Sequence, residues 1–321
     1  MTLQQLRAFL AIVEHGSFRR AARALAISQA GLTGAVQSLE ATLGVQLLHR
    51  SAQGVRLTEA GARLLPRARL IHSESGRAID EATQAQAQHA PLLRVGLGPT
   101  PTAALLRQVV PDFHARHPTV RLKLVEGFFA QLQPALQQGQ IELAITAVPT
   151  EGVGPGLKSR KLFRSDLTVV ARRAHPLAGA RALRQLAGQE WVLLGSPGGP
   201  GGTVLRFHEE QALAPPRIAA TCESFTQLAA LIGGSDWLAI VPSALVHNGF
   251  MGSEVAAIRL AEPTPRYDNC VVHRADTPMT PAAAAFAAMF ASCARVLMQQ
   301  AGEAPAAGAG TRRIAGRTMA R

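Results

Sequence analysis

The sequence lacks the features of a membrane protein or of a secreted, disulfide-rich protein. Only three of its 321 residues are cysteines, Cys222, Cys270 and Cys293, and they stand far apart, with no zinc spacing or disulfide framework. No apolar run reaches the ~18 residues of a membrane-spanning helix. The first residues have no basic segment followed by an apolar stretch and a cleavage site. We therefore expect a cytoplasmic protein with no membrane partner.

The composition is that of a globular protein with an excess of positive charge. Apolar residues make up 47% of the chain, and its length allows two or three domains with a sizeable core. The formal charge of +12 points to an anionic partner. Arginine far outnumbers lysine, so a general bias towards arginine would also explain the charge. The positive charge therefore supports a nucleic-acid partner only where a DNA-binding motif is also present.

Residues 17–40 have the pattern of two short amphipathic helices. Only Ala26 and Ile27 separate them, and helices joined so tightly must cross steeply, as in a helix-turn-helix over Phe18 to Gln37. Ser17 and Ser28 stand where their hydroxyls would cap the two helices. Each helix carries an apolar stripe at helical spacing: Phe18, Ala21, Ala22 and Leu25 in the first, and Leu32, Val36, Leu39 and Leu43 in the second.

The surroundings of this pair complete a winged helix-turn-helix. Residues 2–15 predict a preceding helix whose buried face holds Leu3, Leu6, Phe9, Leu10 and Val13, and Val45, Leu47 and Leu48 should return to the core. Residues 51–58 predict a tight hairpin around Gly54, the wing. Arg50 and Arg56 suit contacts to the phosphate backbone or the minor groove, although either can be an ordinary surface arginine. The outer face of the second helix carries Gln29, Thr33 and Gln37, which can reach base edges of double-stranded DNA.

A long helix follows from residue 59 to about residue 89, with Thr58 as its expected cap. Pro66 and Gly76 predict a bend or a weak point within it. Its narrow stripe of small and apolar residues suits antiparallel pairing with the same helix of a second subunit. Packing on its own chain is the alternative. The stripe consists of Leu64, Ala68, Ile71, Ser75, Ala78 and Ala82.

From residue 91 onwards, expected strands alternate with helices, which predicts a parallel α/β architecture. Two lobes, residues 91–161 with 268–300 and residues 162–267, would enclose a ligand cleft at the carboxyl ends of the strands. Residues 301–321 predict a disordered basic tail. Expected strands are 92–97, 120–127, 141–148, 167–171, 191–195, 217–221, 237–241 and 269–273. Expected helices run from past residue 102 to about 117, and over 128–138, 182–186, 204–212, 225–233 and 281–300.

Residues 1–65 resemble the DNA-binding domain of LysR-type transcriptional regulators, and the resemblance continues more weakly to about residue 300. It implies a winged helix-turn-helix over residues 1–58, a dimerising linker helix over 59–90, and a two-lobed effector domain over 91–300 like a periplasmic binding protein. The matching residues are Leu3, Leu6, Phe9, Val13, Gly16, Ser17, Phe18, Ala21, Ala22, Leu25, Ser28, Gln29, Leu32, Val36, Leu39, Glu40, Gly44, Leu47, Arg50, Leu57, Thr58 and Gly61.

The resemblance also implies partners and roles. It implies a homotetramer, a dimer of dimers, that binds two DNA half-sites and changes their bending when a small effector binds. RNA polymerase is a further partner that such a role allows. Gln29 and Thr33 would touch bases beside the Ser28 cap, with Gln37 next to them, and Arg50 and Arg56 would lie on the backbone. Family members often have Pro, Ser, Arg and Gln where this chain has Ala30, Thr33, Gly34 and Ala35. The operator sequence therefore does not transfer, and Gly34 costs up to about 1 kcal/mol relative to Ala.

The same resemblance places the effector cleft at three loops, 99–102, 196–202 and the segment ending the strand at Thr146. Hydroxyl groups and helix starts there favour an anion, and Phe128 can pack on an apolar or aromatic body. The strings SPGGPG and CESF resemble regulators of aromatic-sulfonate degradation. The expected effector-binding residues are Pro99, Thr100, Thr102, Phe128, Thr146, Ser196 and Pro197.

Two other functions stay open. An enzyme would need a nucleophile, but Cys222, Ser224 and Ser243 lack a G-x-S-x-G motif. We therefore expect no catalytic residues, no metal site and no cofactor. A redox sensor would have to pair Cys222 with Cys270, and no basic residue immediately flanks Cys222 to lower its pKa.

Overall fold

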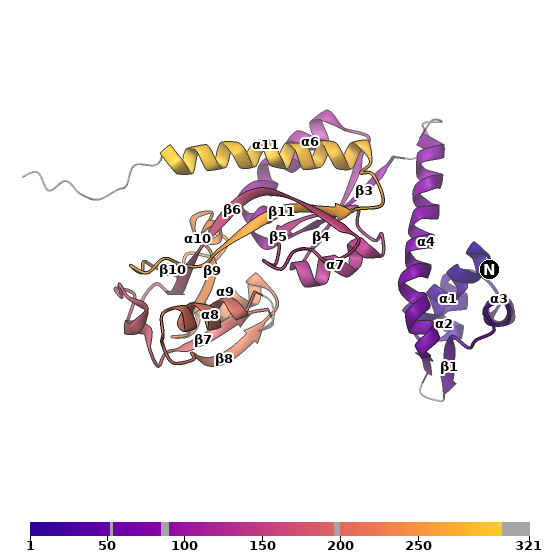
Figure 1. The fold of residues 1–321 in the computed structure, drawn as a ribbon, viewed down its shortest axis with the longest axis horizontal. Helices are drawn as coiled ribbons and strands as arrows, with labels where there is room; N and C mark the ends of the chain where they lie inside the picture. The colour runs from indigo at the N-terminus through magenta and orange to yellow at the C-terminus, as the bar shows by residue number, and fades with distance from the viewer. Residues whose placement is uncertain (52–53, 85–89, 196–199, 304–321) are drawn as a thin grey trace, which may run out of the picture.

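The computed structural model describes residues 1–51, 54–84, 90–195 and 200–303 (Figure 1). Three helices open the chain: α1 (Leu3–His15), α2 (Phe18–Ala24) and α3 (Gln29–Leu43). The hairpin β1 (Leu48–Ser51) and β2 (Gly54–Leu57) and the long helix α4 (Glu59–Gln84) follow. The expected order of elements in a winged helix-turn-helix is thus confirmed.

The caps of these helices match the expectation at two positions of three. Ser28 Oγ accepts the Gly31 amide at 3.0 Å, and Thr58 Oγ1 accepts the Gly61 amide at 3.0 Å. Ser17 stands at the start of α2 with an extended backbone, but its hydroxyl makes no cap bond. The prediction for Ser17 was wrong: the short helix α2 is held by its buried face, with Phe18 8% and Ala21 0% exposed.

The core of this domain is formed by the expected stripes, except at their ends. The buried residues from Leu6 to Leu48 form one cluster, and Ala68 of α4 joins it. Leu3, Leu43 and Val45 are 50%, 39% and 46% exposed, so their expected burial was wrong. Leu3 begins α1, Leu43 ends α3, and Val45 follows the left-handed Gly44, so all three lie where the helices diverge from the core.

The wing begins earlier than expected. Leu48 pairs with Leu57, and Arg50 pairs with Val55, so β1 ends at Ser51 and β2 begins at Gly54. Helix α4 approaches this hairpin closely at Gly61, where an added Cβ would lie 2.1 Å from the Leu47 carbonyl oxygen. A side chain at position 61 would therefore push the helix away from the wing.

Helix α4 extends over 26 residues and stays helical through Pro66 and Gly76. The expected apolar stripe divides along its length. Leu64 and Ala68 pack into the N-terminal core of the same chain, whereas Ile71 is 37% exposed. The alternative of packing on its own chain therefore holds for the first half of the helix.

The second half of the chain contains one mixed seven-stranded sheet and a two-stranded sheet. Strands β3 (Leu92–Leu97), β4 (Arg121–Glu126) and β5 (Leu143–Ala147) pair in parallel, as expected. Strands β7 (Glu190–Leu194) and β8 (Arg217–Cys222) pair in parallel in the second sheet. In the larger sheet, β6 (Leu157–Arg172), β9 (Ala239–Pro242), β10 (Val255–Ile258) and β11 (Arg266–Arg274) pair antiparallel.

The expected parallel pairing is therefore confirmed for β3, β4 and β5 and for β7 with β8, but it was wrong for the strands that pair with β6 and β11. The first part of the 16-residue strand β6 pairs with β11, and its last part pairs with β9 and β10, so one strand runs through both lobes. The strand order is β10-β6-β11-β5-β3-β4. The expected strand at 167–171 is only the end of β6, and β10 was not predicted.

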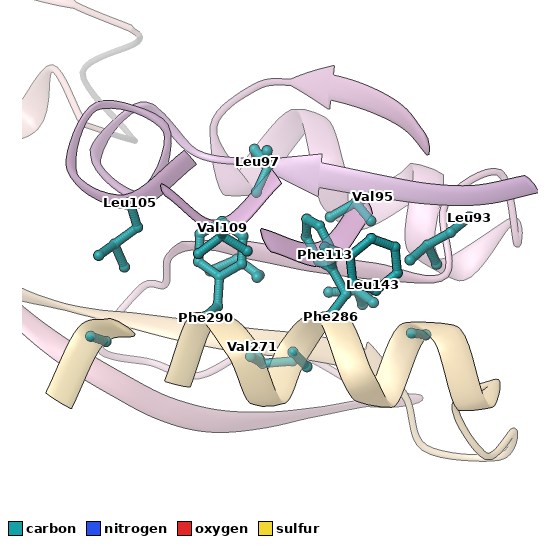
Figure 2. Close-up of a cluster of buried hydrophobic side chains, with 14 of the residues drawn as sticks. Leu93, Val95, Leu97, Leu105, Val109, Phe113, Leu143, Val271, Phe286 and Phe290 are labelled. Atoms are coloured by element: carbon teal, nitrogen blue, oxygen red, sulfur yellow. The ribbon is translucent and has the colours of Figure 1, made fainter. Parts of the chain in front are cut away.

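Helices cover both faces of the first lobe. Helix α6 (Arg107–Arg116) and the long α11 (Pro281–Glu303) cover one face, where Phe286 and Phe290 point towards Val109 and Phe113 (Figure 2). The rings of Phe113 and Phe286 meet edge to face with centroids 5.0 Å apart. Helix α7 (Phe129–Gln137) packs on the opposite face, against Ala144 and Val272.

The remaining helices lie at loops around the two lobes. The first helical run starts at α5 (Pro99–Pro101) and passes through a π-helical turn, Thr102–Leu106, into α6. It starts earlier than expected, because proline suits the first turn of a helix. The others are a 3-10 turn at Leu183–Leu186, α8 (Gly202–Glu210), α9 (Phe225–Gly233) and α10 (Ser243–His247), the last of which was not predicted. The expected tail lies mostly outside the described residues.

Candidate DNA-binding and effector sites

The outer face of α3 presents short polar groups and no charge. Gln29 and Gln37 are exposed and Thr33 is half-buried, one turn apart along the helix, with the Ser28 cap at its start. The acidic Glu40 points away from this face: its Oε1 accepts the Leu47 and Leu48 amides at 2.7 and 3.2 Å. This carboxylate ties the end of α3 to the beginning of the wing, which sets the angle between the two elements.

The wing carries the second predicted group of DNA contacts. Arg56 is exposed on β2 opposite His49, and Arg50 lies on β1 opposite Val55. Both positions are on a two-stranded ribbon beside α3, where winged domains meet the sugar-phosphate backbone. The roles of Ser28, Gln29, Thr33, Gln37, Arg50 and Arg56 stay predictions.

Helix α4 is bonded to the α/β half by a polar junction that sequence reasoning missed. Arg274 Nη1 donates to Glu74 Oε1 at 2.9 Å, Ser73 Oγ donates to the Gly139 carbonyl at 2.5 Å, and Arg69 Nη1 donates to Gln138 Oε1 at 2.8 Å. The Arg274 side chain is only 10% exposed. An arginine at the end of a strand gives no signal of this kind in sequence, because its partner on α4 lies in a distant part of the chain.

The same arginine orders the turn after β11. Its Nε donates to Asp276 Oδ1 at 3.1 Å, and its Nη2 bonds the Thr277 hydroxyl. The hydrogen bond from Arg274 holds the pKa of Asp276 below its usual range. Arg274 therefore joins α4, the turn and β11 through one guanidinium group.

The residues predicted for the effector cleft lie along one edge of the first lobe, past the ends of β3, β4 and β5. Thr100 is 3% exposed and its hydroxyl is 2.6 Å from the Tyr267 hydroxyl. Thr102 Oγ1 donates to the Gly98 carbonyl at 2.9 Å. Thr146 is 1% exposed and lies against Gly98, where an added Cβ would be 2.5 Å from its Oγ1. These three hydroxyls are therefore already engaged or buried within the chain.

Phe128 connects this edge to the second lobe. It follows β4, is half-buried, and packs with the cluster of the second lobe. Its ring centroid lies 6.3 Å from that of Phe225 at the start of α9. Pro99 is half-buried at the start of the first helical run. Ser196 and Pro197 lie outside the described residues.

A buried polar group beneath this edge was missed by sequence reasoning. Asn269 is fully buried, and its Nδ2 donates to Ser165 Oγ at 2.8 Å, while its Oδ1 has no partner in the described part of the chain. Burial raises the pKa of Tyr267 above its usual range, so its hydroxyl stays protonated and can donate. Tyr267 is the only tyrosine of the chain, and the strand was expected to begin two residues after it, which hid its place in the sheet.

A polar groove of about 280 Å³ opens at the opposite ends of the second-lobe strands, where β7, β8 and β9 begin. Trp237 Nε1 donates to Glu190 Oε2 at 3.0 Å, and Arg217 bridges Glu190 Oε1 at 3.3 Å. These groups bond one another, and Asp236, which also lines the groove, pairs with Arg172 at 2.6 Å.

The three cysteines are poorly placed for redox chemistry. Cys222 lies in the core of the second lobe and Cys270 in the core under α7, in separate clusters. Burial raises the pKa of Cys222, Cys270 and Cys293, which favours the neutral thiol over the reactive thiolate. Within the described ranges, no group of three or more metal-ligating side chains comes together. None of the described helices has the length and the hydrophobicity of a membrane span.

Comparisons with known proteins match both halves of the chain. Residues 3–62 match the family "Bacterial regulatory helix-turn-helix protein, lysR family", and residues 86–294 match "LysR substrate binding domain". A "Probable hydrogen peroxide-inducible genes activator" of Streptomyces viridosporus is 34% identical over 82% of this chain and 85% of its own. An "SDS degradation transcriptional activation protein" of Pseudomonas sp. (strain ATCC 19151) is 32% identical over 88% of this chain and 93% of its own.

Solved structures agree over almost the full length. CbnR, a LysR family transcriptional regulator, has a TM-score of 0.70 at 26% identity, covering 92% of this chain and 99% of its own. Its complex with target DNA has a TM-score of 0.67 at the same identity and coverage. An H2O2-bound mutant of Corynebacterium glutamicum OxyR has a TM-score of 0.53 at 27% identity, covering 94% of this chain and 97% of its own.

The family matches and the fold agree with each other and with the resemblance of residues 1–65. A helix-turn-helix with a wing, a long helix and two α/β lobes follow one another in this chain, and the CbnR structure matches 92% of it. The chain belongs to the LysR family of bacterial transcription regulators, which are DNA-binding proteins with an effector-binding domain and not enzymes.

Proposed function

We propose that this regulator changes transcription when a small anionic effector binds between its two α/β lobes. The observation that carries the proposal is the double attachment of α4. Its first half is part of the core of the DNA-binding domain, through Ala68, and its second half is bonded to the α/β half, through Glu74 and Arg274. A change in the α/β half can therefore reach α3 through α4 and the core of the DNA-binding domain, and α4 lies between these two parts (Figure 1).

The proposed organisation follows from this path. Residues 1–58 would read DNA through Ser28, Gln29, Thr33, Gln37, Arg50 and Arg56, residues 59–90 would link, and residues 91–300 would bind the effector. The lobes would comprise 91–161 with 268–300 and 162–267. Four copies would assemble as a dimer of dimers, with RNA polymerase as a further partner. Ile71, 37% exposed on α4, supports pairing through that helix. Because it binds DNA, we expect the protein to work in the cytoplasm, with the chromosome.

The effector class rests on the chemistry around the proposed cleft. The positive ends of α8 and of the helical run from Pro99 favour an anion. Pro99 and Pro101 have no amide hydrogen, so the first turn of that run offers fewer donors than an ordinary helix start. Phe128 and Phe225 favour an apolar or aromatic body. The SPGGPG and CESF strings support an aromatic sulfonate, and SDS, in the name of one relative, is an anionic alkyl sulfate.

Peroxide is the second candidate signal, because relatives and a solved structure carry it in their names. A thiol reaction would have to use one of three cysteines, the first of which is Cys222. Burial raises the pKa of all three thiols. These observations favour a bound effector over a thiol reaction.

A thermal-shift screen on the full chain tests the effector. Organic acids, aromatic sulfonates and alkyl sulfates are each added in excess. A true effector at a hundredfold excess over its dissociation constant stabilises the protein by about 2.7 kcal/mol. The positive compound should also change binding to DNA from the upstream region of the gene.

A peroxide arm separates the two candidates. The Cys222→Ser, Cys270→Ser, Cys293→Ser triple variant should keep its response to the effector, and hydrogen peroxide should not change DNA binding by the wild type. A peroxide response that disappears in the triple variant would refute the proposal.

A further inference from the structure

The recognition helix of this regulator has no basic side chain to hold DNA. Of its 15 residues, none is lysine or arginine, and its one acid, Glu40, is bonded to the Leu47 and Leu48 amides. Contacts with phosphates supply most of the sequence-independent affinity of DNA-binding proteins. That affinity must come from other elements of the domain.

Helix α2 carries an unusual concentration of arginine. Residues 1–58 contain six basic side chains of Lys or Arg, and three of them, Arg19, Arg20 and Arg23, belong to the seven-residue α2. At about 3.6 residues per turn these three positions share one face, opposite the buried Phe18 and Ala21. All three are exposed.

These arginine side chains have no bonded partner among the residues that the structure describes. No hydrogen bond or ion pair joins their side chains to another residue in the described part of the chain. Arg63, at the start of α4, behaves differently, because it pairs with Glu59 at 2.6 Å. A face of three unpaired guanidinium groups on one short helix is suited to an external anion.

One member of this face, Arg20, lies close to the wing of the predicted DNA surface. The Arg20 guanidinium lies beside Gly16, where an added Cβ would be 3.4 Å from its Nη2. Gly54 of the wing approaches the carbonyl oxygen of the same Gly16, with 3.3 Å from an added Cβ. Helix α2 and the wing therefore meet at the turn between α1 and α2. In helix-turn-helix proteins, the first helix of the pair crosses the DNA backbone while the second enters the major groove.

We propose that Arg19, Arg20 and Arg23 bind DNA phosphates next to the groove that α3 enters, and that they replace the basic contacts which α3 lacks. The proposal rests on the DNA-binding role of the family and adds residues to it. Binding through these arginines is independent of base sequence and depends steeply on salt. The uncharged face of α3 is left to discriminate bases.

Salt dependence of DNA binding tests this proposal. The full-length protein is titrated, by fluorescence anisotropy, onto a mixed-sequence duplex and onto a duplex from upstream of its own gene, between about 50 and 200 mM salt. The triple variant Arg19→Gln, Arg20→Gln, Arg23→Gln should lower the slope of log affinity against log salt by about three per DNA-binding domain, since each phosphate contact contributes about one. The loss of affinity should be equal on the two duplexes.

Two matched variants identify the cause. The triple change to lysine keeps the charges and the helical propensity, so the slope should stay within about one unit of the wild type. Arg217→Gln removes one exposed charge from the second lobe, 70% exposed in its ion pair, and should leave the slope unchanged.

Three results would overturn the proposal. They are an unchanged slope in the glutamine variant, an equal loss of slope in the lysine variant, and a loss confined to the upstream duplex. An unchanged midpoint of urea unfolding in the glutamine variant would exclude misfolding as the cause of a lost slope.

Discussion

Breaking the bond between Arg274 and Glu74 should loosen the attachment of α4 to the α/β half. Arg274 is 10% exposed and Glu74 37% in this pair, and the separation is 2.9 Å. Hydrogen bonds to charged groups contribute about 1.5–3 kcal/mol, and partial exposure of Glu74 reduces this value through solvent screening. We expect a coupling free energy of about 1 kcal/mol between the two side chains.

A double-mutant cycle measures this value. Arg274→Met keeps the apolar stem, Glu74→Gln keeps the shape of the acid, and the double variant removes both charges. Urea unfolding of the four proteins gives the coupling free energy, and the cycle removes the other contacts of each residue. The exposed pair Arg217–Glu190, 70% and 42% exposed, is the matched control and should couple by no more than about 0.5 kcal/mol.

The functional readout is the effect of the effector on DNA affinity. If the junction transmits the signal, Arg274→Met should bind the effector as the wild type does but should show a smaller change in DNA affinity. A coupling free energy within about 0.3 kcal/mol of zero, together with a full effector response, would refute the reasoning.

Three further predictions concern the cleft, the DNA surface and the pH. Gly98→Ala should destabilise the protein by about 1–3 kcal/mol through overpacking, because the new Cβ would lie 2.5 Å from Thr146 Oγ1. Urea unfolding measures the loss. A stability equal to that of the wild type would contradict the close approach. Gln29→Ala should weaken binding to the upstream duplex only, whereas Arg56→Ala should weaken binding to any duplex. Equal losses of affinity on both duplexes for Gln29→Ala would disprove its role in reading bases. Hydrogen bonds from two basic neighbours lower the pKa of Asp268 below its ordinary 3.8, so its stabilising effect is complete above pH ~4 and is lost as pH falls through the lowered pKa. Asp268→Asn should therefore be less stable than the wild type at neutral pH and equal to it in acid; a difference that grows on acidification would reverse the sign.

The elements that were predicted correctly are those whose signal is local. The apolar stripes of α2 and α3 recur over one or two helical turns, and the turn between them leaves only one way to bury both stripes. Ser28 and Thr58 cap helices because their partners lie three positions on. The short apolar strands β3, β5 and β7 were likewise close to their expected positions.

The errors occur where contacts between distant parts of the chain decide the outcome. The stripe on α4 reads as one seam, but Ala68 is buried by α1 and its neighbours, and Ile71, a turn later, is exposed. The antiparallel pairing of β6 needs β9, β10 and β11, which all come much later in the chain, and no local pattern reports it.

The sequence by itself determined the DNA-binding module, its order before a long helix and an α/β half, and the uncharged outer face of α3. Those features depend on residue spacing and side-chain chemistry alone. Only the tertiary structure decided that Thr100 meets Tyr267, that Arg274 bonds α4, and that Arg20 of α2 lies beside Gly16, which the wing approaches. Hydrogen bonding and burial depend on which distant residues share a surface, and that is settled when the chain packs.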